Sequence, residues 1–328
     1  MAYLLRPLEV NNLRLKNRLV MPPMATAKAD EEGKITEDIL NYYDEKSKGG
    51  YISLIIIEHA FVSPEGKASN RQISVADDSV IDGLKKLVDT IHNNGSRVVM
   101  QINHAGSGTT REVTGLNPVA PSAVVNPRRG GAVPLELTQG QIKEIVNKFK
   151  EAAIRVKKAG FDGVEIHSAH GFLLNQFLSP LTNKRTDEYG GDIYGRIKIH
   201  LDIIREIKKA LGEDYPLLLR LGATDKTEGG ITIEDSIKAA SEFEKAGVDI
   251  LDISGGFCGY ALPGQAYFAP ISEEIKKAVK VPVIVTGGIK DPYLAEKVLR
   301  EGKADLIGVG RAILNDSSWA KKAVESFV

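Results

Sequence analysis

The stretch KAGVDILDI, residues 245–253, contains the unit from which this chain is built. A helical segment ends at a glycine, and a short run of aliphatic residues follows at once. The same order occurs in KAGFDGVEI at residues 158–166 and in EGKADLIGV at residues 301–309, and NNGSRVVM at residues 93–100 repeats it. Glycine adopts the left-handed conformation that ends a helix, and a continuous apolar run is typical of a buried parallel strand. The repeat therefore predicts helices that alternate with parallel strands.

Apolar runs of this kind occur eight times along the 328 residues. The predicted strands are Arg18–Met21, Ser53–Glu58, Arg97–Asn103, Gly163–His167, Leu217–Leu221, Ile250–Ser254, Val283–Thr286 and Leu306–Val309. Amphipathic segments separate them and predict helices over Thr36–Lys48, Asp78–Asn94, Thr138–Ala159, Tyr194–Leu211, Ile233–Ala246, Ile271–Val279 and Asp291–Glu301. Several of these begin with capping residues, such as Thr138 and the pair Asp291-Pro292.

Eight βα units in a chain of this length match an α/β protein with the (β/α)₈ TIM barrel fold, which typically needs about 250 residues plus insertions. The rival is a doubly wound Rossmann sheet, which expects a glycine-rich loop directly after its first strand. Pro22-Pro23-Met24-Ala25 is not such a loop. No Ser- or Pro-rich linker divides the chain, so we expect one barrel domain over residues 1–328.

Two connections that follow strands are too long to be simple turns. They are residues 105–137 and residues 168–193. Loops longer than about 12–15 residues in a compact domain are usually functional or disordered. Because loops that follow barrel strands lie at the carboxyl-terminal face, where TIM barrels build their active sites, we predict that both are active-site loops.

Composition excludes several classes of protein. Lys plus Arg and Asp plus Glu both number 43, and a chain of zero net charge lacks the basic surface of a nucleic-acid or anionic-membrane binder. Cys258 is the only cysteine, so an intramolecular disulfide, a Cys-ligated zinc site and a Cys₄ iron–sulfur cluster are all impossible. Apolar runs such as Ile52–Ile57 are too short to cross a bilayer, and Met1–Pro7 lacks the apolar core of a signal peptide. We expect a cytoplasmic protein without membrane or nucleic-acid partners.

Polar side chains lie at the ends of the predicted strands. The third strand carries Gln101, the fourth leads into His167 and His170, and the fifth contains Arg220. A polar group buried without a partner is costly, and any one of these residues alone is best interpreted as a paired group at the barrel rim. Several of them at one end of a barrel indicate a functional site instead.

Glycines and an arginine follow the last two strands. Gly287 and Gly288 come after the seventh strand, and Gly310 and Arg311 come after the eighth. TIM barrels often bind phosphate with backbone N–H groups of these two loops. An arginine adds a fixed, cationic hydrogen-bonding fork, so these positions predict a phosphate site, with two plain glycine turns as the alternative.

The spacing of His167 and His170 argues against metal and nucleophilic chemistry. A metalloprotease pair needs histidines four residues apart with an intervening Glu, and no third ligand is evident, so no metal site is predicted. No Gly-x-Ser-x-Gly elbow for a nucleophilic serine occurs either. Two imidazoles at one strand end suit hydrogen bonds to an oxygen on which negative charge develops.

Six stretches together resemble the old yellow enzyme family and cover nearly the whole chain. They are HSAHGFLLNQFLSP at 167–180, NKRTDEYGG at 183–191, NRLVMPPM at 17–24, QINHAG at 101–106, APS at 120–122 and ADLIGVGR at 304–311. The resemblance implies an FMN-binding (β/α)₈ barrel in which NADH or NADPH reduces the flavin and leaves. An electron-poor acceptor, such as a quinone, a nitro compound or an activated alkene, would then take the hydride.

The resemblance also implies roles for individual residues. His167 and His170 would hold the oxygen of the acceptor over the flavin. Gln101 would hydrogen-bond the pyrimidine edge of the flavin ring, and Arg220 would lie near its N1–C2 region. The complete set of implied FMN contacts is Pro22, Pro23, Met24, Ala25, His59, Gln101, Arg220, Gly287, Gly288, Gly310 and Arg311.

Three positions depart from the pattern of the family. Ala25 stands where relatives carry a Cys or Thr that tunes the flavin, and His59 stands where they carry a small residue. Phe172 replaces the Tyr that usually donates a proton to the alkene, although Tyr260 is another candidate donor. With Cys258 as the only cysteine, we do not expect the iron–sulfur cluster of the larger dienoyl-CoA reductase branch, nor its extra domain.

The expected function is that of an FMN-dependent NAD(P)H oxidoreductase, assembled as a homo-oligomer, that acts on small molecules. Quinones and nitro compounds are expected to be better acceptors than enones because Phe172 has no hydroxyl. One alternative is a flavin-binding protein of low turnover. The other is a different FMN-barrel dehydrogenase of the dihydropyrimidine dehydrogenase type, for which no active-site Cys or Ser loop is apparent.

Overall fold

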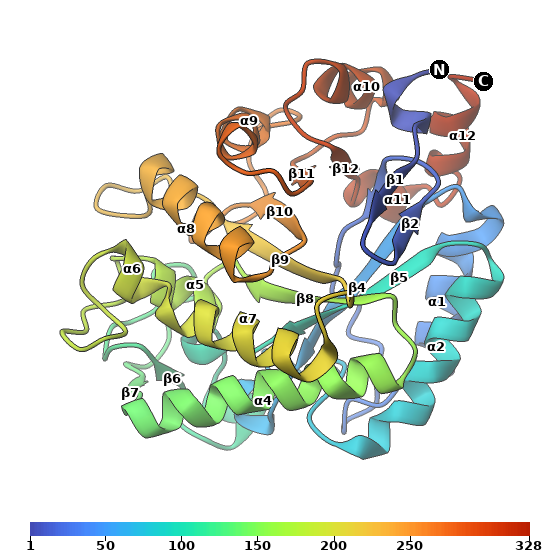
Figure 1. The fold of residues 1–328 in the computed structure, drawn as a ribbon. Helices are drawn as coiled ribbons and strands as arrows, with labels where there is room; N and C mark the ends of the chain where they lie inside the picture. Colours follow the sequence, from blue (N-terminus) through green and yellow to red (C-terminus); the bar gives the residue numbers. More distant parts are fainter.

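Eight parallel strands pair side by side into a closed barrel in the computed structural model, which describes residues 1–328 (Figure 1). The ring closes where β12 pairs in parallel with β3. All eight predicted strands are confirmed, and their ends shift by no more than three residues. They are β3 (Leu19–Met21), β4 (Leu54–Phe61), β5 (Arg97–Asn103), β8 (Gly163–Ser168), β9 (Leu217–Gly222), β10 (Ile250–Ser254), β11 (Val283–Thr286) and β12 (Leu306–Gly308).

Helices surround this barrel, and each predicted helix is present. The segment predicted as one helix over Tyr194–Leu211 is divided at Ile197 into α6 (Ile193–Arg196) and α7 (Lys198–Leu211). The others are α1 (Glu37–Ser47), α2 (Ile81–Asn93), α4 (Gln139–Lys158), α8 (Ile233–Ala246), α9 (Ala269–Ala278) and α10 (Pro292–Arg300), with α11 (Arg311–Asn315) and α12 (Trp319–Glu325) after the last strand. None of them combines the length and the apolar character needed to span a membrane.

The helix ends follow the local chemistry of the sequence. The Thr138 side chain accepts from the backbone N–H of Gln141, whose side chain returns a bond to the Thr138 backbone, which forms a capping box. The Asp291 side chain caps α10 by accepting from the backbone N–H of Tyr293. Gly247 ends α8 with a φ of 112°, a conformation that side chains with a Cβ rarely adopt.

A hairpin that the sequence did not predict seals the amino-terminal end of the barrel. It consists of β1 (Leu8–Val10) and β2 (Leu13–Leu15), which pair antiparallel. Leu13 and Leu15 are buried against the lowest inward-facing side chains of the barrel, a cluster completed by Val20, Leu54, Ile56, Val99, Leu218, Ile250, Ile284 and Leu306. Only the opposite, carboxyl-terminal end is therefore left to hold a ligand.

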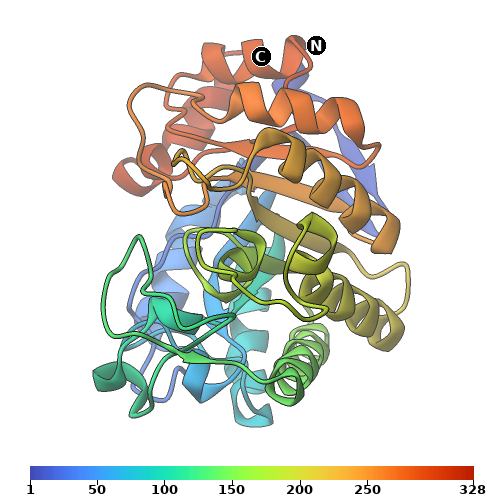
Figure 2. The ribbon, with the colours of Figure 1, turned by 90° about the vertical axis from the view of Figure 1, so that its left-hand side faces the viewer.

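The two long loops lie at this carboxyl-terminal end, on the side that faces the viewer in Figure 2. Residues 105–137 contain the short helix α3 (Arg111–Thr114) and the paired strands β6 (Val119–Ala120) and β7 (Leu135–Glu136). Residues 168–193 contain α5 (Leu173–Leu178), whose residues are all buried. The second loop is thus largely a packed part of the barrel end rather than an open surface loop.

Candidate active site

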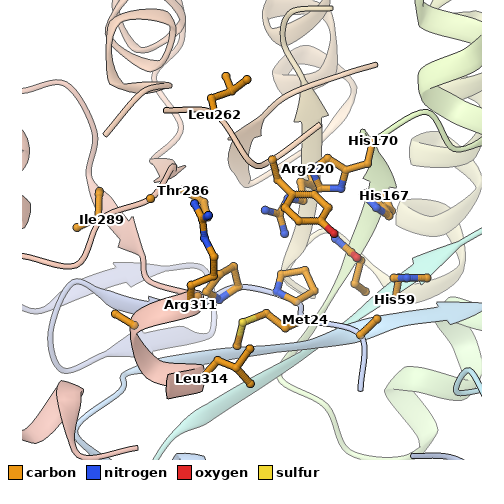
Figure 3. A pocket seen from close by; sticks show the side chains of 18 of the residues that line it. Met24, His59, His167, His170, Arg220, Leu262, Thr286, Ile289, Arg311 and Leu314 are labelled. Carbon is orange, nitrogen blue, oxygen red and sulfur yellow. The ribbon is translucent and has the colours of Figure 1, made fainter. Parts of the chain in front are cut away.

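One cavity of about 940 Å³ lies at the carboxyl ends of the barrel strands (Figure 3). Its size is at the upper end of the range for small-molecule sites. It is lined by every predicted site residue except Gly287, namely Pro22, Pro23, Met24, Ala25, His59, Gln101, His167, His170, Phe172, Arg220, Gly288, Gly310 and Arg311. Residues from strands spread along the whole chain therefore meet where the strand count placed them.

Gly287 is the one predicted site residue that does not line this cavity. It lies against Tyr267, and a Cβ on Gly287 would come 3.2 Å from Cδ2 of that ring. Its carbonyl accepts from the backbone N–H of Tyr267 at 3.3 Å. Gly288 does line the cavity and has a φ of 71°, and a Cβ there would come 2.8 Å from the carbonyl oxygen of Gly264. A side chain at position 288 would thus be both strained and crowded.

Arg311 makes the glycine-lined end of the cavity cationic. Its Nη2 donates to the hydroxyl of Tyr267 at 3.1 Å, and no carboxylate pairs with it. Lys290 lines the same cavity. Gly288 and Gly310 add no side chain to this end, which leaves room for an anionic group beside the guanidinium.

Polar side chains form the floor, one layer above the apolar plug of the barrel. Nε2 of Gln101 donates to Oε2 of Glu165 at 2.6 Å, and Nε of Arg220 lies 3.2 Å from Oδ2 of Asp252. Burial raises the pKa of Asp252 to about 6 and, together with the charge of Asp252, raises that of Glu165 well above its usual range. The positive charge of Arg220 opposes both shifts, so this guanidinium is the charge partner of the two buried carboxyl groups.

Three imidazoles form one wall of the cavity. The ring centroids of His167 and His170 are 5.1 Å apart, and those of His59 and His167 are 6.0 Å apart. Burial lowers the pKa of His59 to about 4 and those of His167 and His170 well below 6.5, and the charge of Arg220 acts in the same direction. All three rings are neutral at pH 7, so each has one N–H to donate.

The hydrogen bonds of Gln72 define the tautomer of His59. Oε1 of Gln72 accepts from the backbone N–H of Ala68 at 2.6 Å, and Nε2 of Gln72 donates to the carbonyl of His59 at 2.9 Å. The amide nitrogen therefore also faces Nδ1 of His59, 2.7 Å away, and this ring nitrogen must accept. The proton of the neutral ring is then on Nε2, the nitrogen left for the cavity.

Two further lining residues come from loops, and of these the sequence analysis named only Tyr260. Arg129 of the 105–137 loop places its guanidinium carbon 4.5 Å from the centroid of Phe172. Tyr260, from the loop after β10, packs its ring 5.1 Å from that of His170. Residue Arg129 brings the 105–137 loop to the cavity, while Gln72 and Tyr267 had no signal in a single sequence.

The arrangement suits a ligand that has an anionic end and a flat polar ring. Arg311 and the glycines receive the anion, and Gln101 and Arg220 present donors on the floor. Nδ1 of His167 is buried beside them without a hydrogen-bond partner in the protein. FMN has this shape and these polar groups, so the residues present fit it. No group of three or more His, Cys, Asp or Glu side chains is placed to hold a metal ion.

A TIM barrel with an anion cradle after its last two strands and donors on its floor defines the class of phosphate-anchored cofactor barrels. Comparison with known proteins identifies the family within that class. Residues 3–327 match the model of the NADH:flavin oxidoreductase / NADH oxidase family. The chain belongs to this family, whose cofactors are FMN and a nicotinamide, and the resemblance to old yellow enzyme is confirmed.

Three relatives illustrate the similarity. The NADH oxidase of Thermoanaerobacter brockii is 44% identical over 326 residues, which cover 96% of this chain and 50% of that protein. The NADPH dehydrogenase of Bacillus subtilis is 37% identical over 327 residues, which cover 98% and 94%. The solved old yellow enzyme homologue from Zymomonas mobilis superposes with a TM-score of 0.87 at 26% identity and covers 99% of this chain and 93% of that one. The chain thus spans about half of the first relative and nearly all of the other two.

Proposed function

We propose that this chain is an FMN-dependent oxidoreductase that passes a hydride from NADH or NADPH, through the flavin, to a small electron-poor acceptor. In the overall reaction NAD(P)H, a proton and the acceptor give NAD(P)⁺ and the acceptor reduced by two electrons. The observation that carries the proposal is that a single cavity joins a cationic glycine cradle to two neutral imidazoles 5.1 Å apart. When bound, FMN supplies the hydride carrier.

The cofactor contacts proposed for this chain follow the polarity of the cavity. Arg311, with the backbone N–H groups of Gly288 and Gly310, binds the phosphate as a charge-assisted contact. Gln101 and Arg220 hydrogen-bond the polar edge of the ring from the floor. The remaining contacts come from the apolar segment after β3, which consists of Pro22, Pro23, Met24 and Ala25.

His167 and His170 are proposed to bind the oxygen of the acceptor. Nε2 of His170 lies 2.8 Å from Oγ of Ser254, which leaves Nδ1 of that ring for the cavity. Neutral N–H donors held in a buried site stabilise the negative charge that develops on an oxygen during hydride transfer. His59 adds a third donor, Nε2–H, on the same wall.

The acceptor class follows from what Phe172 lacks. Reduction of an alkene needs a proton on the carbon next to the one that receives the hydride, and Phe172 has no hydroxyl to supply it. Quinones and nitro compounds can take their protons on oxygen directly from water. We therefore propose that quinones or nitro compounds are better acceptors than enones.

Purification of the protein tests the cofactor assignment. Heat denaturation is expected to release FMN, identified by chromatography against FAD. Arg311→Ala should weaken FMN binding by about 1.5–3 kcal/mol, because a charge-assisted contact to the phosphate is lost. Arg300→Ala, on the exposed end of α10, is the matched control. An unchanged dissociation constant in Arg311→Ala would show that the phosphate lies elsewhere.

A flavin-binding protein of low turnover is the second candidate function, and Phe172 is the observation that favours it. Steady-state oxidation of NADH and NADPH is measured with a quinone, a nitro compound and an enone as acceptors. Oxidation faster than the background reaction with oxygen supports the oxidoreductase. Rates that stay at that background with every acceptor would contradict it.

A further inference from the structure

The charges that line the cavity are unbalanced. Four cationic side chains line it, whereas none of the 27 lining residues is an aspartate or a glutamate. Arg220 is balanced from below by Asp252, 3.2 Å away. Arg311 and Lys290 lie at the proposed phosphate end. Arg129 is the remaining cation of the lining, and neither Asp252 nor the proposed phosphate offsets its charge.

Arg129 and its neighbour Arg128 have no acidic partner. The guanidinium of Arg129 makes no side-chain hydrogen bond and no ion pair, and that of Arg128 makes only one bond, at 3.5 Å, to the carbonyl of Phe257. Their contacts are with aromatic faces instead. The guanidinium carbons lie 4.5 Å and 5.4 Å from the ring centroids of Phe172 and Tyr260, respectively. Both arginines are exposed, so water solvates them, and the planar fork of Arg129 is left free to bind an anion that enters the cavity.

A buried asparagine holds the two arginines in place. Oδ1 of Asn126 accepts from the backbone N–H groups of Arg128 and Arg129 at 3.0 Å and 3.1 Å. Nδ2 of Asn126 donates to the carbonyl of Gly171 at 2.9 Å. Gly171 lies between His170 and Phe172 in the chain, so this turn is tied to the wall that carries the proposed acceptor-binding histidines.

The acceptor side is therefore where the extra positive charge lies. The ring of Phe172, which Arg129 covers, is 5.2 Å from that of His167. Phe172 offers no hydroxyl, so the guanidinium above it is the polar group that this part of the wall presents. An arginine cannot act as a proton donor at neutral pH, but its planar fork matches a carboxylate.

We propose that the acceptor of this enzyme carries a carboxylate, or a comparable anionic group, which Arg129 binds while His167 and His170 hold the reducible oxygen. This inference rests on the proposed function and names its substrate class. A phosphate of the nicotinamide has the same anionic chemistry, and the test separates the two sources.

The probes are 4-nitrobenzoate and 4-nitrobenzamide, which share the nitro group and differ in charge. We measure kcat/KM for each with NADPH, and the binding of each to the oxidised holoprotein by calorimetry. The preference for the carboxylate over the amide should fall about ten- to hundredfold in Arg129→Gln, because a hydrogen bond to a charged group is lost. Most of this fall should lie in KM. Arg129→Lys should recover part of the preference, and added salt should lower it in the wild type.

Arg111→Gln is the matched control, since Arg111 lies on α3 of the same loop, is exposed and does not line the cavity. It should keep the wild-type preference. Equal effects of Arg129→Gln on both probes, in binding and in kcat/KM, would overturn the inference while leaving the oxidoreductase intact. Arg129-dependent binding of 4-nitrobenzoate without any turnover would support the inference and contradict the proposed function instead.

The nicotinamide source is tested in the reductive half-reaction. Stopped-flow mixing of the holoprotein with NADH and with NADPH gives a dissociation constant for each from the loss of flavin absorbance. We expect Arg129→Gln to change these constants less than it changes that of 4-nitrobenzoate. A larger change for NADPH would assign the arginines to a nicotinamide phosphate and overturn the acceptor assignment.

Discussion

At the scale of a single residue, Phe172 offers a test of the proposed preference among acceptors. Its ring lines the cavity and lies 5.1 Å from that of His59 and 5.2 Å from that of His167. Phe172→Tyr adds a hydroxyl to this wall, and general acid catalysis typically contributes roughly 10²–10⁴-fold. The ratio of enone to quinone turnover should therefore rise within that range, as measured by steady-state oxidation of NADPH.

Tyr260 provides the control for this prediction. Its ring is near His170 and half of its surface is exposed, so it could already supply a proton from the loop after β10. Tyr260→Phe should leave enone turnover low if the missing acid is the cause. Wild-type enone reduction as fast as quinone reduction, with no gain in Phe172→Tyr, would show that the argument about the missing acid is wrong.

Gln72, which does not line the cavity, sets the tautomer of His59. We predict that ¹⁵N spectra of the histidine-labelled protein show His59 at pH 7 as a neutral ring with the proton on Nε2, because Nδ1 accepts from Gln72. Since burial lowers its pKa to about 4, the ring should stay neutral down to mildly acidic pH. The signal is assigned with His59→Gln.

Gln72→Leu tests the cause of this tautomer. Loss of the donor to Nδ1 should give a mixture of the two neutral tautomers. Gln72→Asn should have the same effect, because the shorter side chain cannot keep the bond. A wild-type ring protonated on Nδ1, or an unchanged spectrum in Gln72→Leu, would contradict the assignment.

The β1–β2 hairpin acts at the scale of an element, as the seal of the barrel. Leu13 is fully buried against the lowest layer of inward-facing side chains. Leu13→Ala should lower the free energy of unfolding by about 2–5 kcal/mol, the range for a buried Leu that leaves a cavity behind. Urea unfolding, with the slope of the transition compared between variants, measures this loss.

Arg14 lies between the two buried leucines of the hairpin and provides the matched control. It pairs only with Glu9, and 76% of its side chain is exposed. Arg14→Ala should change the free energy of unfolding by less than about 1 kcal/mol, as is usual for exposed ion pairs. Equal losses in the two variants would show that the hairpin does not seal the barrel through its leucines.

The buried histidines give the whole molecule a dependence on pH. Burial lowers the pKa of His200 to about 3 from 6.5, while its ring packs on Phe243 and bonds Ser168. Between these values the unfolded chain binds a proton that the folded chain does not. The free energy of unfolding therefore falls as pH falls below 6.5, by about 2 kcal/mol for His200 between pH 7 and pH 5.

His200→Gln isolates this contribution. The raised pKa values of Glu165 and Asp252 act in the opposite direction, since the folded chain holds those protons more tightly. This opposing contribution is the same in the wild type and in His200→Gln. Urea midpoints at pH 7 and pH 5 should differ less in His200→Gln than in the wild type. The same difference in both proteins would refute the assignment. The expected homo-oligomer stays a prediction that light scattering can check.

The sequence alone determined the barrel and the main outline of its site. Strands buried on both faces must be apolar throughout, so runs such as Leu54–Ile57 can be recognised from the sequence. Glycines such as Gly247 mark the ends of the helices that precede the strands. Once eight strands are counted, their carboxyl ends converge by the geometry of the fold. His167, Gln101 and Arg220 could thus be placed in one cavity without coordinates.

Only the tertiary structure decided the contacts between loops. Nothing in a single sequence says that Arg129 lies over Phe172, that Gln72 orients His59, or that Gly287 faces Tyr267 and not the cavity. The path of a loop is set by side-chain bonds to distant segments, such as that from Asn126 to Gly171, and not by a local period. The loop-built wall of the cavity therefore depends on long-range packing, whereas the barrel beneath it follows from local pattern.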